Sequence, residues 1–254
     1  PLADPYILGI SSGASLGATS AILLGIGASL GPNFVGISAF IGAFVLSLAV
    51  LLISNLGGRS NSMNLLLAGM ALSAVCSAFS SFIVYFANNK EGMQSIAYWL
   101  MGSLAGAKWN ELAVIAPVII VSVLIFWTQS RVLNLMLLGD ETAITMGTDL
   151  HLYRQWYLLI SSLIVGFAVY AAGMSGFVGL IIPHVMRMFL GPDHKKLIPA
   201  STLVGAIFLV ICDGLCRIII PHTELPIGIL ISMIGAPCFI YLMIKRTYGF
   251  GGND

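Results

Sequence analysis

Three serines lie at helical spacing in one long apolar segment and could offer hydroxyl groups to a passing solute. Ser73, Ser77 and Ser81 recur every four residues, which places them on one face of a helix. A ladder of weakly bonding hydroxyls suits the passage of a large polar solute better than its tight capture. The same side chains can instead bond to the carbonyl one turn earlier, as packing or kink residues. Both interpretations stay open at this point.

A charged pair lies inside another apolar segment. Asp213 and Arg217 are four residues apart, so each can neutralise the other on a helix, and Glu224 follows soon after. Charged side chains within a membrane span are costly and are usually paired or near water. A rise of about 1.5 Å per residue places Arg217 close to the outer end of its segment. Arg217 is therefore expected as a structural ion pair or as an exposed docking charge.

The residue types that usually bind metals or carry catalysis form no recognisable group. The chain has four histidines and four cysteines, at His151, His184, His194, His222, Cys76, Cys212, Cys216 and Cys238. Their spacing matches no metal-ligand pattern, and the cysteines lie in apolar runs as packing residues. The sequence contains no GxxxxGK[ST] or HExxH motif. We therefore expect no metal, no cofactor and no catalysis by the chain itself.

Composition assigns these residues to a membrane protein. Of 254 residues, 58% are hydrophobic and 8% are Asp, Glu, Lys or Arg, against roughly 25% charged in soluble domains. The mean hydropathy is +1.00. This excludes a water-soluble globule, and at about 20 residues per span the chain has room for about eight to ten crossings. The net charge of +1 gives no electrostatic case for a nucleic-acid partner.

Eight apolar segments of helical length follow one another along the chain. They run approximately over 7–25, 35–54, 65–87, 112–128, 156–172, 177–190, 200–220 and 225–244. The sequence thus predicts an all-α, polytopic membrane bundle with eight transmembrane helices. In the first segment, Gly9, Gly13 and Gly17 recur at every fourth position, which favours close packing of helix backbones in lipid. A groove facing the substrate is the alternative for this face.

Two connections are longer than simple turns. The connection over 88–111 carries an amphipathic stretch at 95–104, which indicates a short re-entrant or interfacial helix. The connection over 129–155 is the most polar part of the chain, and its run LNLMLLGDETAITMG indicates two short helices. Long connections in compact proteins usually carry function or a partner contact.

The basic residues orient the chain, because Lys and Arg are retained on the cytoplasmic side during insertion. With eight spans, the connections on the side of the two chain ends hold Arg59, Arg131, Arg154, Arg187, Lys195, Lys196, Lys245 and Arg246. The opposite side holds Lys90, Lys108 and Arg217. We therefore expect both ends in the cytoplasm.

Six stretches together resemble one transporter family. They are PLADPYILGISSGASLGA, LLLAGMALSAVCSAF, YWLMGSLAGA, LLGDETAITMG, GFVGLIIPHVMRMFLGPDHKKLIPAS and ELPIGILISMIGAPCFIYLM, and they cover nearly the whole chain in the family's order. They are similar to the permease subunits of type II ABC importers, the FecCD-type family, which take up ferric siderophores, haem and vitamin B12.

The resemblance implies partners and contact residues. It implies a permease homodimer or heterodimer in the bacterial cytoplasmic (inner) membrane, ABC ATPase subunits on the cytoplasmic face and a solute-binding protein outside. In the family, the loop that LLGDETAITMG resembles contacts the ATPase, so the transferred contacts are Gly139, Asp140, Glu141, Ala143 and Gly147. Arg217 matches an outer arginine that meets the binding protein, which favours docking by Arg217 and Glu224 over a purely structural pair. Ser73, Ser77 and Ser81 would line the translocation path.

Family permeases have ten helices, and the stretch PLADPYILG resembles the opening of the third. We therefore expect residues 1–254 to be one transmembrane domain lacking the family's first two helices, with 129–155 as its cytoplasmic coupling loop. The expected cargo is an iron-siderophore chelate, with haem or cobalamin as alternatives. An ion-coupled secondary transporter, the remaining alternative, would need acidic residues near the bilayer midplane, whereas Asp213 lies toward the outer end of its segment.

Overall fold

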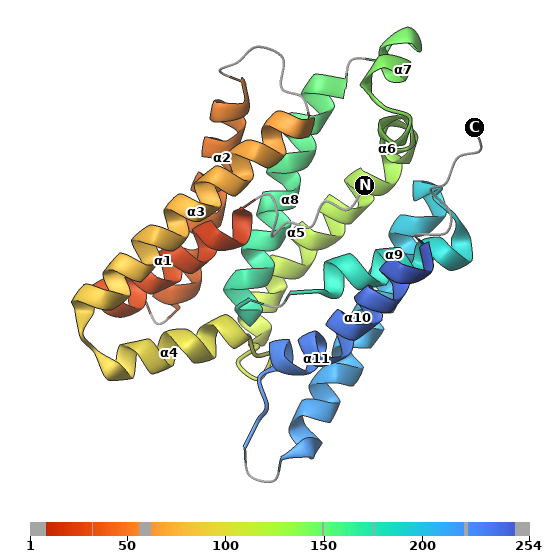
Figure 1. Ribbon diagram of the computed structural model, residues 1–254. Coiled ribbons are helices and arrows are strands. Elements are labelled where there is room, and N and C mark those ends of the chain that lie inside the picture. Colours follow the sequence, from red (N-terminus) through yellow and green to blue (C-terminus); the bar gives the residue numbers. More distant parts are fainter. Residues whose placement is uncertain are drawn as a thin grey trace.

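Every regular element in the described part of the chain is a helix (Figure 1). The structure is a computed structural model that describes residues 9–31, 33–55, 62–148, 150–174, 176–220 and 223–246. Its elements are α1 (Ile10–Leu24), the 3-10 turn η1 (Ala28–Leu30), α2 (Phe34–Asn55), α3 (Ser62–Ala87), α4 (Lys90–Met101), α5 (Trp109–Thr128), α6 (Ser130–Leu137), α7 (Asp140–Thr145), α8 (Leu150–Ala172), α9 (Val178–Leu190), α10 (His194–Ile219) and α11 (Ile227–Arg246). Each of the eight predicted segments corresponds to one of these helices, so the prediction of an all-α bundle is confirmed.

Five of the helices in the described ranges are long and apolar enough to cross a membrane, namely α2, α3, α5, α8 and α10. The other three predicted segments form shorter apolar helices, α1, α9 and the Ile227–Tyr241 part of α11. Large apolar side chains are exposed along these helices, for example Phe86 on α3 and Val210 on α10. Lipid or partner subunits must cover such surfaces, so the chain is a polytopic membrane protein. The number of eight crossings stays a prediction.

The small-residue face of α1 packs against α2 with the two backbones in contact. A Cβ atom on Gly17 would overlap the carbonyl oxygen of Ser38, and a Cβ on Gly13 would overlap that of Gly42. Gly42 in turn faces the carbonyl of Gly13, so the α2 side of the contact also depends on a missing side chain. The interpretation of this ladder as a packing face is confirmed, because dispersion contacts at such short separation hold helices together in lipid.

Three buried clusters hold the bundle together. The first joins α1, α2 and α8, and the second joins α2, α3 and α8. The third joins α10 to α11 around Cys212, Cys216 and Ile231, so these cysteines are packing residues as the sequence suggests. Figure 1 shows α6 and α7 at one end of the bundle and α4 at the other.

Three helices begin five or six residues earlier than their sequence patterns suggest. The helix α8 begins at Leu150 rather than near 156, α10 at His194 rather than near 200, and α4 at Lys90 rather than near 95. In α8 the extra turn is polar, yet His151 Nε2 lies 3.2 Å from Asn55 Oδ1 at the end of α2. Polar side chains at the starts of α8 and α10 have partners on other helices, whereas Asn89 caps α4 locally by accepting from the N–H of Gly92. Hydropathy along the chain does not reveal such partners. The last six residues of the predicted loop 129–155 therefore belong to α8.

Candidate functional site

Two short helices project from one end of the bundle, within the predicted coupling loop (Figure 1). The helices α6 and α7 are joined through Leu138 and Gly139, and Gly139 has φ 92°, a conformation that glycine adopts without strain. Asp140 and Glu141 are the first two residues of α7, and their side chains lie outside the described part of the structure.

Among the described side chains of α7 and its C-terminal end, one is buried and its apolar neighbours are exposed. Ala143 is 0% exposed, whereas Ile144 is 56% and Met146 60% exposed. The helix ends in a Schellman motif, since the N–H of Thr148 donates to the carbonyl of Ala143 and the N–H of Gly147 to that of Ile144. Gly147 supplies the positive φ of 79° that this ending requires. Ala143 and Gly147 thus fix the shape of a helix whose apolar side chains face outward.

A groove of about 830 Å³ runs beside α6. Its lining residues are Arg131, Asn134, Leu135, Leu137, Leu138, Pro192 and Asp193. Leu137 and Leu138 are exposed at its edge, which extends the apolar surface of α7 onto α6. An exposed apolar surface beside a membrane domain, outside the long apolar helices, is typical of a protein docking site.

The side chain of Asn134 joins α6 to the first turn of α10. Asn134 Nδ2 donates to Asp193 Oδ1 over 2.9 Å, and Asn134 Oδ1 accepts from the backbone N–H of His194 over 3.0 Å. His194 Nδ1 lies 2.6 Å from the same Oδ1 atom. Asp193 is the N-cap of α10 and accepts from the N–H of Lys195 over 3.1 Å. The hydrogen bonds from Asn134 and then from Lys195 lower the pKa of the Asp193 carboxyl below its ordinary value.

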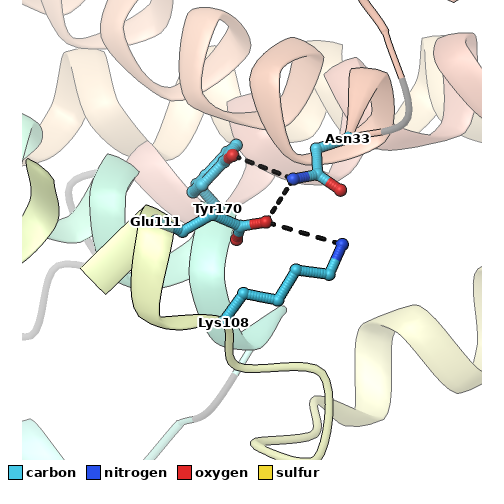
Figure 2. A network of polar contacts seen from close by, with 4 residues as sticks. All are labelled: Asn33, Lys108, Glu111 and Tyr170. Atoms are coloured by element: carbon cyan, nitrogen blue, oxygen red, sulfur yellow. Dashed lines mark hydrogen bonds and ion pairs between the residues drawn. The ribbon is translucent and has the colours of Figure 1, made fainter. Parts of the chain in front are cut away.

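A polar network lies at the opposite end of the bundle, where three helices meet (Figure 2). Asn33 precedes α2, Lys108 and Glu111 begin α5, and Tyr170 is near the end of α8. Asn33 Nδ2 donates to Glu111 Oε1 and, over 3.2 Å, to the Tyr170 hydroxyl. Lys108 Nζ lies 3.8 Å from the same Glu111 oxygen. The network fastens α2, α5 and α8 to one another at this end.

The predicted docking residues lie near the same end as this network. Arg217 Nε donates to Asp213 Oδ2 over 2.9 Å, in the expected pair along one helix. The Arg217 side chain is 49% exposed despite this bond, so its remaining donors can reach a partner. Glu224, in the turn before α11, is exposed. The ion pair is present, and the docking role of both residues stays a prediction.

The predicted path serines occupy two environments. Ser77 and Ser81 are exposed on α3, whereas Ser73 lies against Gly9 at the start of α1. The Ser73 hydroxyl is buried and has no hydrogen-bond partner among the described residues. Beyond Ser81 the exposed aromatic side chains of Phe82, Tyr85 and Phe86 pack against one another, Phe82 tilted against Phe86 and Tyr85 edge to face with it. Their role as a path lining stays a prediction.

Sequence reasoning missed the residues that join elements far apart in the chain. Asn134 is separated from Asp193 by 59 positions, and Asn33 from Tyr170 by 137. Single asparagines in apolar surroundings were the available signal, since a buried amide needs partners. Among the described residues, no three His, Cys, Asp or Glu side chains gather as a metal site.

Comparison with known proteins places the chain in a family. The sequence profile of the FecCD transport family matches residues 1–245. The cobalamin import system permease protein BtuC of Halobacterium salinarum is 39% identical over 250 residues, which cover 97% of this chain and 65% of that protein. The hemin transport system permease protein HmuU of Yersinia pestis is 38% identical over 249 residues, 97% of this chain and 74% of that protein.

A solved structure shares the fold. It shows an inward-facing conformation of an ABC transporter assigned to the metal-chelate type, with a TM-score of 0.86 and 34% sequence identity. The match covers 96% of this chain and 77% of that chain. The chain thus spans about two thirds to about three quarters of the length of these three proteins. Sequence, fold and the order of the motifs agree, and the chain is a member of the FecCD transport family.

Proposed function

We propose that the chain is the permease subunit of an ABC importer in the cytoplasmic membrane, with α6 and α7 facing the cytoplasm and contacting ABC ATPase subunits. The observation that carries the proposal is the pair of short helices itself. Exposed apolar side chains on α6 and α7, outside the long apolar helices, need a protein to cover them. No ATP-binding motif occurs in the chain, so hydrolysis belongs to a separate subunit.

The transferred contact residues divide into two kinds in this proposal. Gly139, Ala143 and Gly147 shape α7 from within, by turn geometry and burial. Asp140 and Glu141 begin the same helix, where carboxylates are favoured by the helix dipole and where the ATPase would meet them. Replacing Glu141 is therefore expected to weaken coupling without preventing insertion of the chain.

Transport requires a path, which we place along α3 and at a two-fold interface with a second permease copy or a heterodimer partner. Support comes from the exposed hydroxyls of Ser77 and Ser81, which continue into the exposed aromatic cluster Phe82, Tyr85 and Phe86. Ser73 lies deeper, against Gly9, and would border the path from behind. A second copy would also cover part of the exposed apolar face of α3.

Arg217 and Glu224 supply the proposed contact with an extracytoplasmic solute-binding protein. Arg217 is already bonded to Asp213, which orients the guanidinium and lowers the free-energy cost of a charge at the end of a span. The opposite charge of Glu224 would pair with a basic residue of the binding protein. Charge reversal of either residue should reduce the rate of association with the binding protein, most strongly at low salt.

An iron-siderophore chelate is the proposed cargo. Haem and cobalamin are the second candidates, because relatives named for hemin and cobalamin transport are 38% and 39% identical to this chain. Competition uptake tests the choice, with labelled ferric siderophore, haem and cobalamin offered to cells that carry the chain and its partner subunits. The siderophore proposal fails if unlabelled haem or cobalamin, and not siderophore, suppresses uptake.

The proposed ABC importer and an ion-coupled secondary transporter differ in their energy source. Asp213 is paired with Arg217 near one end of α10, which gives no support for a titrating carboxylate at mid-membrane. ATPase activity stimulated by the binding protein, in membranes that contain the chain, is the decisive measurement. Uptake that survives ATPase inactivation and collapses with an ionophore would contradict the proposed function.

A further inference from the structure

The coupling helix α6 is attached to the body of the protein through the amide of Asn134. The attachment joins α6 to α10, the helix that carries Arg217 toward its other end. Because α10 has 26 residues, its ends are about 39 Å apart. A contact at its first turn can therefore connect the two ends of the protein through one continuous helix.

The chemistry of the partners fixes the orientation of the Asn134 amide. The backbone N–H of His194 can only donate, so the amide atom that faces it must be the acceptor Oδ1. The amide nitrogen then faces the Asp193 carboxylate, which can only accept when ionised. His194 Nδ1, at 2.6 Å from the same Oδ1, must carry a proton to donate to it. One side chain from α6 thus completes the cap of α10.

The first turn of α10 needs these bonds. The first N–H groups of a helix have no partner inside the helix. Asn134 satisfies that of His194, and Asp193 satisfies that of Lys195. A second contact supports the junction, because Trp127 Nε1 at the end of α5 donates to the carbonyl oxygen of Lys195 over 3.0 Å. Moving α6 away would leave donors of α10 unsatisfied, so α6 and the start of α10 are held as one unit.

We propose that Asn134 is a positioning residue for coupling: its amide links α6 to the Asp193–His194 cap of α10, so that a movement of the coupling helices is transmitted to α10. The inference rests on the proposed function and deepens it. Asn134 contacts neither cargo nor nucleotide in this proposal. It acts through Asp193 and His194, and its loss should separate ATP hydrolysis from stimulation by the binding protein.

An exchange of the two side-chain types tests the link. Asn134→Asp retains an acceptor for His194 but places a second carboxylate against Asp193. Asp193→Asn alone keeps a cap of equal quality and an acceptor for the Asn134 amide, so its effect should be small. In the structure Asp193 Oδ1 accepts from both Asn134 and Lys195. In the double variant the amide at 193 must therefore turn so that its nitrogen donates to the new carboxylate while its oxygen accepts from Lys195, which makes the donor and acceptor set complete again. Rescue by the second substitution is a result that a general loss of stability would not produce.

Two measurements are made on the complete transporter, with its ATPase and binding-protein subunits, in lipid nanodiscs. The first is the ratio of stimulated to basal ATPase activity, which should fall about fivefold or more in Asn134→Asp and recover in the double variant. The second is hydrogen–deuterium exchange over 194–197, which should speed up and recover in parallel. Gln94→Glu is the control, because it makes an amide-to-carboxylate change on an exposed side chain of α4, at the opposite end of the bundle from α6.

The outcomes separate the inference from the proposed function. If the unmodified transporter shows no stimulation, the proposed function is overturned and the inference with it. If stimulation is normal and Asn134→Asp alters exchange but not the activity ratio, the junction is only structural and the inference alone is overturned. A loss of the ratio that the double variant does not restore also overturns it. Should Asn134→Asp not accumulate in the membrane, Asn134→Ala replaces it, with the same loss of ratio expected and an unchanged ratio refuting the inference.

Discussion

The exposed apolar side chains of α7 should provide much of the affinity for the ATPase. Ile144 is 56% exposed and Met146 60% exposed. Burying a whole side chain of this size stabilises by about 1.5–3 kcal/mol, so covering the exposed part of each contributes about 1–2 kcal/mol. Replacing both by serine should therefore weaken the association by about 2–4 kcal/mol, which is about 30- to 700-fold in Kd.

The assay titrates the permease in nanodiscs with the ATPase subunit from the same host and measures the Kd of their association. Ile26→Ser is the matched control, because Ile26 is also 56% exposed but follows α1 at the opposite end of the bundle from α7. That variant should bind the ATPase normally. Equal loss in Ile26→Ser, or unchanged binding after replacement of Ile144 and Met146, would refute the assignment of α7 as the docking surface.

Three further changes test the packing, the turn and the cap. Gly17→Ala should lower the free energy of unfolding, measured by SDS titration, by about 1–3 kcal/mol, because its Cβ would overlap the backbone of α2. Gly214→Ala is the control: it has open space around it, so the same titration should show unchanged or higher stability. Gly147→Ala should lower the free energy of unfolding by about 1 kcal/mol, because alanine is strained at the positive φ of this position. It should reduce coupling, measured as stimulated ATPase activity, more than insertion, measured as membrane yield. Because the folded-state pKa of Asp193 is lowered, its stabilisation is complete above its ordinary value near 3.8 and is lost as pH falls through the folded value. The stability difference between wild type and Asp193→Ala, which loses the cap, should therefore shrink only under those acidic conditions.

The helices could be predicted from the sequence because long apolar runs in this chain have few alternatives. In lipid each backbone group must be satisfied within its own segment, which makes apolar length a strong signal for a helix. The short pair α6 and α7 was also predictable, since Gly139 and Gly147 punctuate a polar stretch with helical composition. The packing face of α1 was predictable as well, because Gly13 and Gly17 carry no side chain and so allow the backbone of α2 to approach closely.

Helix starts and polar junctions were not predictable, because they depend on residues far along the chain. The start of α10 precedes Pro199 and is completed by Asn134 on α6. The first turn of α8 is supported by Asn55, 96 positions before His151. A single sequence shows these asparagines only as isolated amides, and without the fold nothing indicates which carboxylate or ring lies opposite. The same limit concealed the junction formed by Asn33 at the other end of α5 and α8.

The polar junctions also indicate which helices move together. The helices α2 and α8 are joined at both ends, by Asn55 at one end and by Asn33 with Tyr170 at the other, and they share two buried clusters. Sliding one past the other would break bonds at both ends at once. By contrast α10 is joined to α6 through Asn134 and to α5 through Trp127, all at one end.

Relative movement should therefore occur between the α2–α8 pair and the α10–α6 pair, with α5 connected to both. Spin labels placed on α2 and α8 of the complete transporter should keep a constant distance when nucleotide is added. Labels on α2 and α10 should change their distance, because the coupling helix carries the start of α10 with it. If the α2–α8 distance changes as much as the α2–α10 distance, bonds at both ends of that pair do not hold it as one body, and the division of the bundle inferred from them is wrong.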